Sequence, residues 1–193
     1  MSSDELPSWR ETTAKQAITE FVAAVTDPDS PDLVPERDRV AVFDNDGTLW
    51  TEQPVYAQLM FALDRAAELE FRVGDGGPEL LKTAKVGVVD DGPQKPSSIH
   101  RHVGQRPIVA AGNTDGDLAM LQWTAASPYR TLQLVVHHTD GDREYAYDRD
   151  PILGSSTDQI LAAATEHKWT VIDMAADWAV VHANAQVSAK GAL

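Results

Sequence analysis

The chain has 193 residues, which is enough for one domain with a sizeable core, and its composition of 42% hydrophobic and 24% charged residues is ordinary for a soluble globular protein. The formal net charge of −14 argues against nucleic acid or an anionic membrane as a partner, and the absence of cysteine excludes disulfides and thiolate metal sites. Residues 1–7 are polar and acidic, unlike a secretion signal, and no apolar run approaches membrane-spanning length, so we expect a cytoplasmic protein.

The pattern of apolar residues predicts helices that alternate with strands along most of the chain. Helices are expected at 11–25, 54–69, 96–103, 118–125 and 157–167, and strands at 39–43, 106–111, 132–137 and 169–174. Residues 70–89 are predicted to form a hairpin that leads into a further strand. This alternation is typical of an α/β protein whose parallel sheet is covered by helices on both faces.

Two carboxylates follow the first expected strand, whose apolar run predicts burial on both faces. Asp44 and Asp46 are one residue apart and precede Gly47. Parallel sheets bind ligands beyond the carboxyl ends of their strands, and paired carboxylates there suit a hard cation such as Mg²⁺. The alternative is an ordinary Asx-rich turn, since the sequence contains five Asp-Gly pairs.

A second strand, expected at 106–111, also ends in a glycine and polar residues that open a helix. Asn113 and Asp117 occupy this position, where both residue types also serve as helix N-caps. Lys95 lies between the two acidic strings, before a helix that a proline opens. An isolated lysine is usually a solvated surface charge, but next to crowded carboxylates it would neutralise them and hold an anion. Lys82 and Lys85 are the competing candidates, although they belong to a strand-like segment. Arg101 and Arg106 could also help to hold an anion, and the sequence leaves this open.

The string Phe43-Asp44-Asn45-Asp46-Gly47-Thr48-Leu49 resembles the first motif of the haloacid dehalogenase superfamily, D-x-D-G-T-[LV] after a hydrophobic strand. The string from Gly112 to Leu121 resembles its fourth motif, and Lys95 is placed like the lysine of its third motif. The resemblance is nearest to the phosphoserine-phosphatase-like hydrolases. It implies a three-layer α/β/α Rossmann-type fold with a mainly parallel sheet, formed by residues 1–193 as a single core domain in which 1–38 are an N-terminal helix and loop.

The resemblance also implies roles for individual residues in phosphoryl transfer. Asp44 would be the nucleophile, Asp46 the general acid and base, and Lys95 the cation that stabilises the phosphoryl oxygens, with Gly47 and Thr48 also contacting the substrate. Mg²⁺ would be the cofactor, and its ligands would be Asp44, Asp46, Asn113 and Asp117. Because Asn113 is neutral where the family's motif has an acid, we expect weaker metal binding than usual.

Two parts of the family pattern are missing from the middle of the chain. Only 50 residues separate Asp44 from Lys95, too few for the helical cap that selects the substrate. The second motif, a strand ending in Ser or Thr, is also absent, and Thr83 is a poor substitute. The chain therefore resembles a family member shortened by an internal deletion. The lost strand would have paired with 39–43, so we expect either that 70–89 fills the gap or that the chain forms a homo-oligomer through this exposed edge.

These features favour a weak, promiscuous phosphatase that acts on small phosphorylated metabolites. The alternative is a catalytically impaired remnant that binds Mg²⁺ or phosphate, or that serves as an interaction module. Dehalogenation at carbon is less favoured, because an acid at Asp46 suits phosphate esters. The pair His137-His138 suggests a transition metal, but no carboxylate–histidine spacing supports one.

Overall fold

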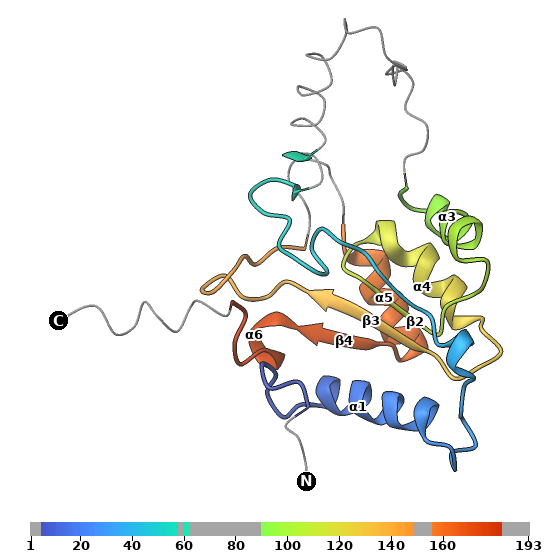
Figure 1. Cartoon of the computed structure of the whole chain (residues 1–193). Helices are drawn as coiled ribbons and strands as arrows, with labels where there is room; N and C mark the ends of the chain where they lie inside the picture. The colour runs from blue at the N-terminus through green and yellow to red at the C-terminus, as the bar shows by residue number, and fades with distance from the viewer. Residues whose placement is uncertain (1–4, 58–59, 62–89, 149–155, 183–193) are drawn as a thin grey trace, which may run out of the picture.

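The computed structural model describes residues 5–57, 60–61, 90–148 and 156–182 (Figure 1). Within them, four parallel strands form a sheet in the order β1-β2-β3-β4, with bounds Ala41–Phe43, Val109–Gly112, Leu132–His137 and Thr170–Asp173. The register places Ala41 beside Val109, and Leu134 beside Thr170. The predicted α/β class and parallel sheet are therefore confirmed.

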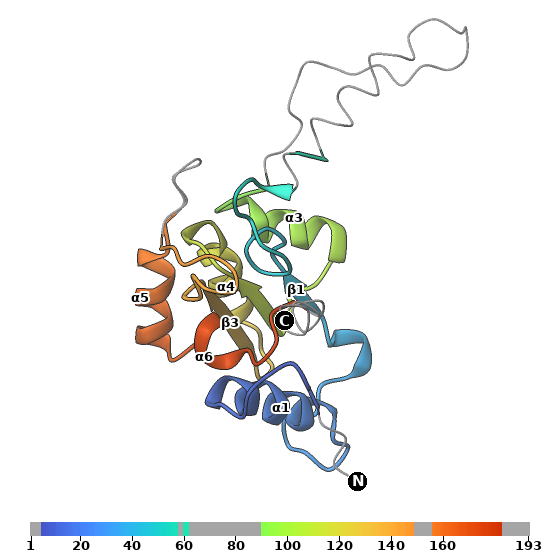
Figure 2. The ribbon, with the colours of Figure 1, turned by 90° about the vertical axis from the view of Figure 1, so that its left-hand side faces the viewer.

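Helices cover both faces of this sheet, as Figures 1 and 2 show from two sides. Helix α1 (Thr13–Thr26) lies on one face. On the other face lie α3 (Gln94–Val103), α4 (Leu118–Ala125) and α5 (Asp158–His167). The short helix α6 (Met174–Asp177) follows β4 directly, and two 3₁₀ turns occupy Glu36–Asp38 and Asp115–Asp117. The arrangement is three-layered and compatible with a Rossmann-like fold.

Alternation along the strands divides the core into two clusters. Leu134 of β3 faces the α1 layer and packs in the cluster that contains Phe21. The next residue, Val135, faces the opposite layer with Leu121 and Ile160. Side chains point to opposite faces at successive strand positions, so a fully apolar strand such as β3 supplies both cores at once.

The expected elements agree closely with the observed ones wherever the structure describes the chain. The bounds of α4 and β3 are as predicted, and the other strands and helices end within three residues of their predicted ends. Of the helix expected at 54–69, residues 57, 60 and 61 are helical, and most of the remainder lies outside the described residues. The whole of 70–89 also lies outside them, and with it Lys82, Thr83 and Lys85. No helix among the residues that the structure describes is long and apolar enough to cross a membrane.

The prediction that β1 is buried on both faces is wrong. Ala41 and Phe43 are exposed, and Phe43 retains 47% of its accessible surface. The reason is position, because β1 is an edge strand of the described sheet and pairs there only with β2. Only Val42, which faces the α3–α5 layer, packs against a core cluster from this strand.

Candidate active site

The carboxyl ends of β1 and β2 bring the two acidic strings together. Asp44 follows β1 and donates its backbone N–H to the carbonyl of Ala111 in β2 (2.9 Å). The chain then turns tightly, since the carbonyl of Asn45 accepts the N–H groups of Thr48 (3.1 Å) and Leu49 (2.9 Å). Gly47 adopts φ +82°, and a Cβ there would lie 2.0 Å from Nδ2 of Asn113. The glycine is therefore required by both backbone conformation and space.

Lys95 joins the two strings through its ammonium group. It lies in the first turn of α3, and its Nζ donates to Oδ1 of Asp44 (2.6 Å) and to Oδ1 of Asp117 (2.5 Å). The side chain of Lys95 is 11% exposed, whereas that of Asp117 is 1% exposed. Lys95 is thus a partly buried cation between two carboxylates, whereas the competing Lys82 and Lys85 lie outside the described residues.

Burial and crowding shift the pKa values of this cluster in a consistent direction. Burial, and then the charge of Asp117, raise the pKa of Asp44 above its ordinary value, although Lys95 opposes the shift. Burial alone would lower the pKa of Lys95, but the charges of Asp117 and Asp44 outweigh it and raise the pKa. The lysine is therefore held in its charged form, and negative charge in excess of one lysine collects at this point.

Asp117 contacts both the backbone before α4 and the ammonium of Lys95. Its Oδ2 accepts the backbone N–H groups of Asn113 (2.9 Å) and Thr114 (3.1 Å), which completes a capping box at the start of the 3₁₀ turn before α4. Its Oδ1 is the oxygen that Lys95 holds. Asp117 is the third residue of the capping box, whose N-cap is Thr114, and the same fully buried carboxylate contacts Lys95.

Asp46 lies in the same turn but points to a different partner. The indole Nε1 of Trp50 donates to its Oδ1 (2.6 Å), and the side chain is buried. The structure thus brings Asp44, Lys95, Asp117 and Asn113 together, whereas the carboxylate of Asp46 hydrogen-bonds within its own turn.

A buried polar layer behind the turn contains Glu52, which the sequence did not single out, and His138, which it marked only as half of a histidine pair. Glu52 is 2% exposed, and its Oε1 accepts a hydrogen bond from Nδ2 of Asn113 (3.1 Å). His138 donates from Nε2 to the carbonyl of Gly47 (2.7 Å), and its Nδ1 lies 3.0 Å from Oε2 of Glu144. The ring of His138 stacks on Tyr147 at 4.6 Å. No sequence pattern predicts the contacts with Asn113 and Gly47, because these residues meet only through the fold.

Comparisons with known proteins found no match: neither a family model nor a curated protein matches this chain.

The oxygen donors at the site suit a hard divalent cation in kind. Candidate donors are the carboxylates of Asp44 and Asp117, the amide oxygen of Asn113 and the carbonyl of Asp46. Within the described part of the chain, no three histidine or acidic side chains form a ready-made metal group. The fit to Mg²⁺ depends instead on the two carboxylates that share Lys95. Burial, and then the charge of Asp117, raise the pKa of Asp44, and a bound cation would offset both effects.

The remaining candidate groups lie elsewhere. Arg106 donates to the carbonyl of Trp123 (2.6 Å) and lies over its ring, so it is not directed to Lys95. Arg101 is exposed on α3. Nε2 of His137 pairs with Oδ1 of Asp148 (2.7 Å), whereas the adjacent His138 contacts Gly47 and Glu144, so the two histidines do not converge.

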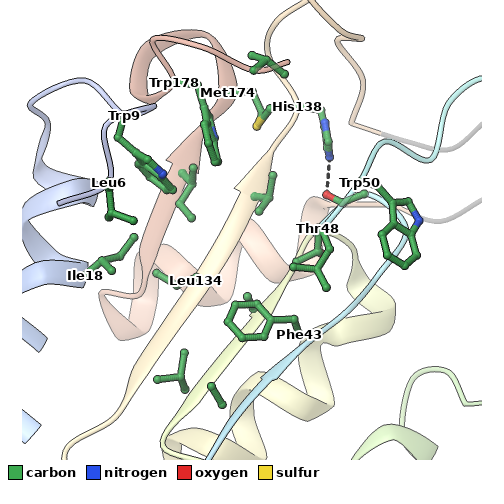
Figure 3. A pocket seen from close by; sticks show the side chains of 18 of the residues that line it. Leu6, Trp9, Ile18, Phe43, Thr48, Trp50, Leu134, His138, Met174 and Trp178 are labelled. Atoms are coloured by element: carbon green, nitrogen blue, oxygen red, sulfur yellow. Dashed lines mark hydrogen bonds between the residues drawn. The ribbon is translucent and has the colours of Figure 1, made fainter. Parts of the chain in front are cut away.

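An apolar cavity of about 630 Å³ lies on the α1 face of the sheet (Figure 3). Its walls include Trp9, Phe43, Leu134 and Trp178, and His138 stands at one end beside the turn. Asp44, Lys95 and Asp117 are not among the lining residues. The three charged groups are therefore not part of its walls, although Gly47 and Thr48 of the adjoining turn are.

Proposed function

We propose that the chain is a Mg²⁺-dependent hydrolase of the haloacid dehalogenase type, which acts on small phosphomonoesters through an aspartyl-phosphate on Asp44. One observation carries the proposal: the ammonium of Lys95 bonds to Asp44 and Asp117 at the carboxyl ends of two neighbouring parallel strands. It is supported by the motif resemblance, which assigns the same residues to phosphoryl transfer.

In the proposed first step, the carboxylate of Asp44 attacks phosphorus while the bond from phosphorus to the ester oxygen breaks. The departing oxygen takes a proton from Asp46, whose carboxyl must leave its hydrogen bond with Trp50 to do so. Water then attacks the phosphorus of the aspartyl-phosphate and gives its proton to Asp46. Inorganic phosphate departs, and Asp44 regains its carboxylate.

Lys95 balances the charge that gathers on the phosphoryl oxygens, and Gly47 and Thr48 line the path of the substrate next to the turn. Asp44, the carbonyl of Asp46, Asn113 and Asp117 would hold Mg²⁺, which when bound supplies further positive charge for the same oxygens. Without a second motif, one phosphate donor is lost, which lowers the rate by a factor on the order of a hundred. Without a cap, water exclusion and selectivity are poor, so the expected enzyme is weak and promiscuous.

The test is hydrolysis of p-nitrophenyl phosphate by the full chain, with and without Mg²⁺. We expect slow, Mg²⁺-dependent release of nitrophenol that falls to background in the Asp44→Asn variant. Equal rates for wild type and variant would remove the proposal, because the nucleophile would then have no role in turnover.

The second candidate is a catalytically impaired remnant that binds Mg²⁺ or phosphate without turnover. It is favoured by the 2.6 Å hydrogen bond from Nε1 of Trp50 to Oδ1 of Asp46, which engages the proposed acid within its own turn. Calorimetric titration with Mg²⁺ and with inorganic phosphate discriminates the two. Binding without any hydrolysis, in wild type and in Trp50→Phe alike, identifies the remnant.

A further inference from the structure

The side chain of Asn113 is fixed in one orientation from two sides. Its Nδ2 donates to Oε1 of Glu52 (3.1 Å), and its Oδ1 faces the hydroxyl of Thr48 (3.4 Å). A carboxylate oxygen can only accept and a hydroxyl can donate, so this arrangement assigns the nitrogen to Glu52 and the oxygen to Thr48. Gly47, with no side chain, leaves the space that the amide occupies.

Glu52 is a carboxylate inside the protein, with 2% exposure, directly behind this amide. Burial raises the pKa of Tyr147, and the nearby Glu52 carboxylate raises it further. The charge of Glu52 therefore influences the groups around it. A buried carboxylate is costly unless donors such as an amide N–H surround it. The proposed reaction uses Asn113 but gives Glu52 no task.

We propose that Glu52 is a positioning residue that supplies, through Asn113, the negative charge that the metal site lacks at position 113. The amide presents its oxygen on the side of Thr48, in the turn that follows Asp44, and the carboxylate of Glu52 polarises that oxygen through the Nδ2 hydrogen bond. Outer carboxylates of this kind orient a ligand and raise its basicity. The inference rests on the proposed Mg²⁺ site, and it replaces the expectation that a neutral Asn113 simply weakens that site.

An exchange of the acid and the amide tests the inference. Four proteins are compared: wild type, Glu52→Gln, Asn113→Asp, and the double variant that carries both changes. The readouts are the Mg²⁺ dissociation constant by calorimetry and the melting temperature of the metal-free protein by circular dichroism. Asp177→Asn serves as a control, because Asp177 is also a buried carboxylate but lies in α6.

We expect Glu52→Gln to weaken Mg²⁺ binding by about tenfold, the lower end of outer-ligand effects. Asn113→Asp alone places two carboxylates against each other in the metal-free protein, so its melting temperature falls. The double variant restores one acid and one amide in reversed order, so both the melting temperature and Mg²⁺ affinity return toward wild type. The control Asp177→Asn lowers the melting temperature and leaves Mg²⁺ affinity unchanged.

Three results would overturn the inference in distinguishable ways. Unchanged Mg²⁺ affinity in Glu52→Gln removes the role of Glu52 and leaves the proposed function standing. If the double variant binds Mg²⁺ no better than Glu52→Gln, one negative charge at positions 52 and 113 does not determine the Mg²⁺ affinity. Failure of the wild-type protein to bind Mg²⁺ removes this inference together with the metal-dependent function, whereas binding without hydrolysis removes only the function.

Discussion

At the scale of single residues, the site depends on how one cation is shared between carboxylates. Lys95 bonds to Asp44 and Asp117, and its pKa is raised because their charges outweigh its burial. The three groups are interdependent, since loss of the ammonium would leave two carboxylates facing each other. Exposed ion pairs, such as that between Arg130 and Asp32 (2.9 Å), have water to replace a lost partner.

Lys95→Met is therefore expected to lower the free energy of unfolding by about 3 kcal/mol, because it leaves buried charge without its partner. Added Mg²⁺ should recover part of this loss, since it would replace the missing positive charge. The control Arg130→Met removes an exposed cation and should lower stability by no more than about 1 kcal/mol. Urea titrations with and without Mg²⁺ measure both, and equal losses in the two variants would contradict the buried character of the Lys95 cluster.

A second residue-scale prediction concerns Gly47, where φ is +82° and a new Cβ would meet the side chain of Asn113. Gly104 ends α3 with φ +79°, but a Cβ added there would have no atom within 4 Å. Gly104→Ala should thus lower the free energy of unfolding by about 1 kcal/mol, through left-handed backbone strain alone. Gly47→Ala should lower it by about 2 kcal/mol more, because the new Cβ overpacks the site. Denaturant midpoints of the two variants supply the comparison, and similar values would show that the amide can move aside.

At the scale of elements, the loop after β3 is joined to α6 by Arg143. Its guanidinium donates to the carbonyls of Trp178 (2.8 Å) and Met174 (3.1 Å) and to the carboxylate of Asp140. Burial alone would raise the pKa of Asp140, but the backbone N–H and guanidinium of Arg143 lower it below the ordinary value of 3.8. The pair therefore stabilises the packing of two elements that are distant in sequence.

The sign of the pH dependence follows from this lowered pKa. The contribution of Asp140 to stability is present above pH 3.8, the pKa of the unfolded chain, and is lost as the pH falls through the lower folded value. Asp140→Asn should thus reduce the free energy of unfolding by about 1–3 kcal/mol at pH 7, with the difference from wild type vanishing in strong acid. Chemical denaturation across pH 2–7 tests this, and a constant difference would show that the carboxylate charge is irrelevant.

The elements themselves were largely predictable from sequence, and the reasons are local. The apolar run of β3 and the punctuating glycines and prolines determine the bounds of the elements, and two acidic strings after strands predict a shared edge of the sheet. The contacts of Glu52 with Asn113 and of His138 with Gly47 were not predictable, because each spans more than sixty residues of chain. The exposure of Phe43 was missed for a similar reason, since burial depends on neighbours that a strand's own residues do not specify.

At the scale of the whole molecule, β1 and the adjacent cavity form one continuous apolar region. Phe43 contributes to both, as an exposed side chain of the edge strand and as a wall of the cavity. The carbonyl of Val40 and the N–H of Asp44 bond toward β2, so by alternation the backbone groups of Ala41 and Phe43 face away from it. Such an edge is a template for pairing with another strand.

We therefore expect the chain to self-associate through β1, with an association that strengthens at high salt because each copy carries a net charge of −14. Sedimentation velocity over a range of concentrations should show the association in wild type and its loss in Phe43→Lys, which places a charge on the edge strand. The matched control is Val171→Lys, at an exposed position of β4 on the opposite edge of the described sheet. Disruption by the control alone would assign the contact to β4. A monomer whose amides at 41 and 43 exchange with solvent as fast as loop amides would exclude both self-pairing and pairing with residues 70–89.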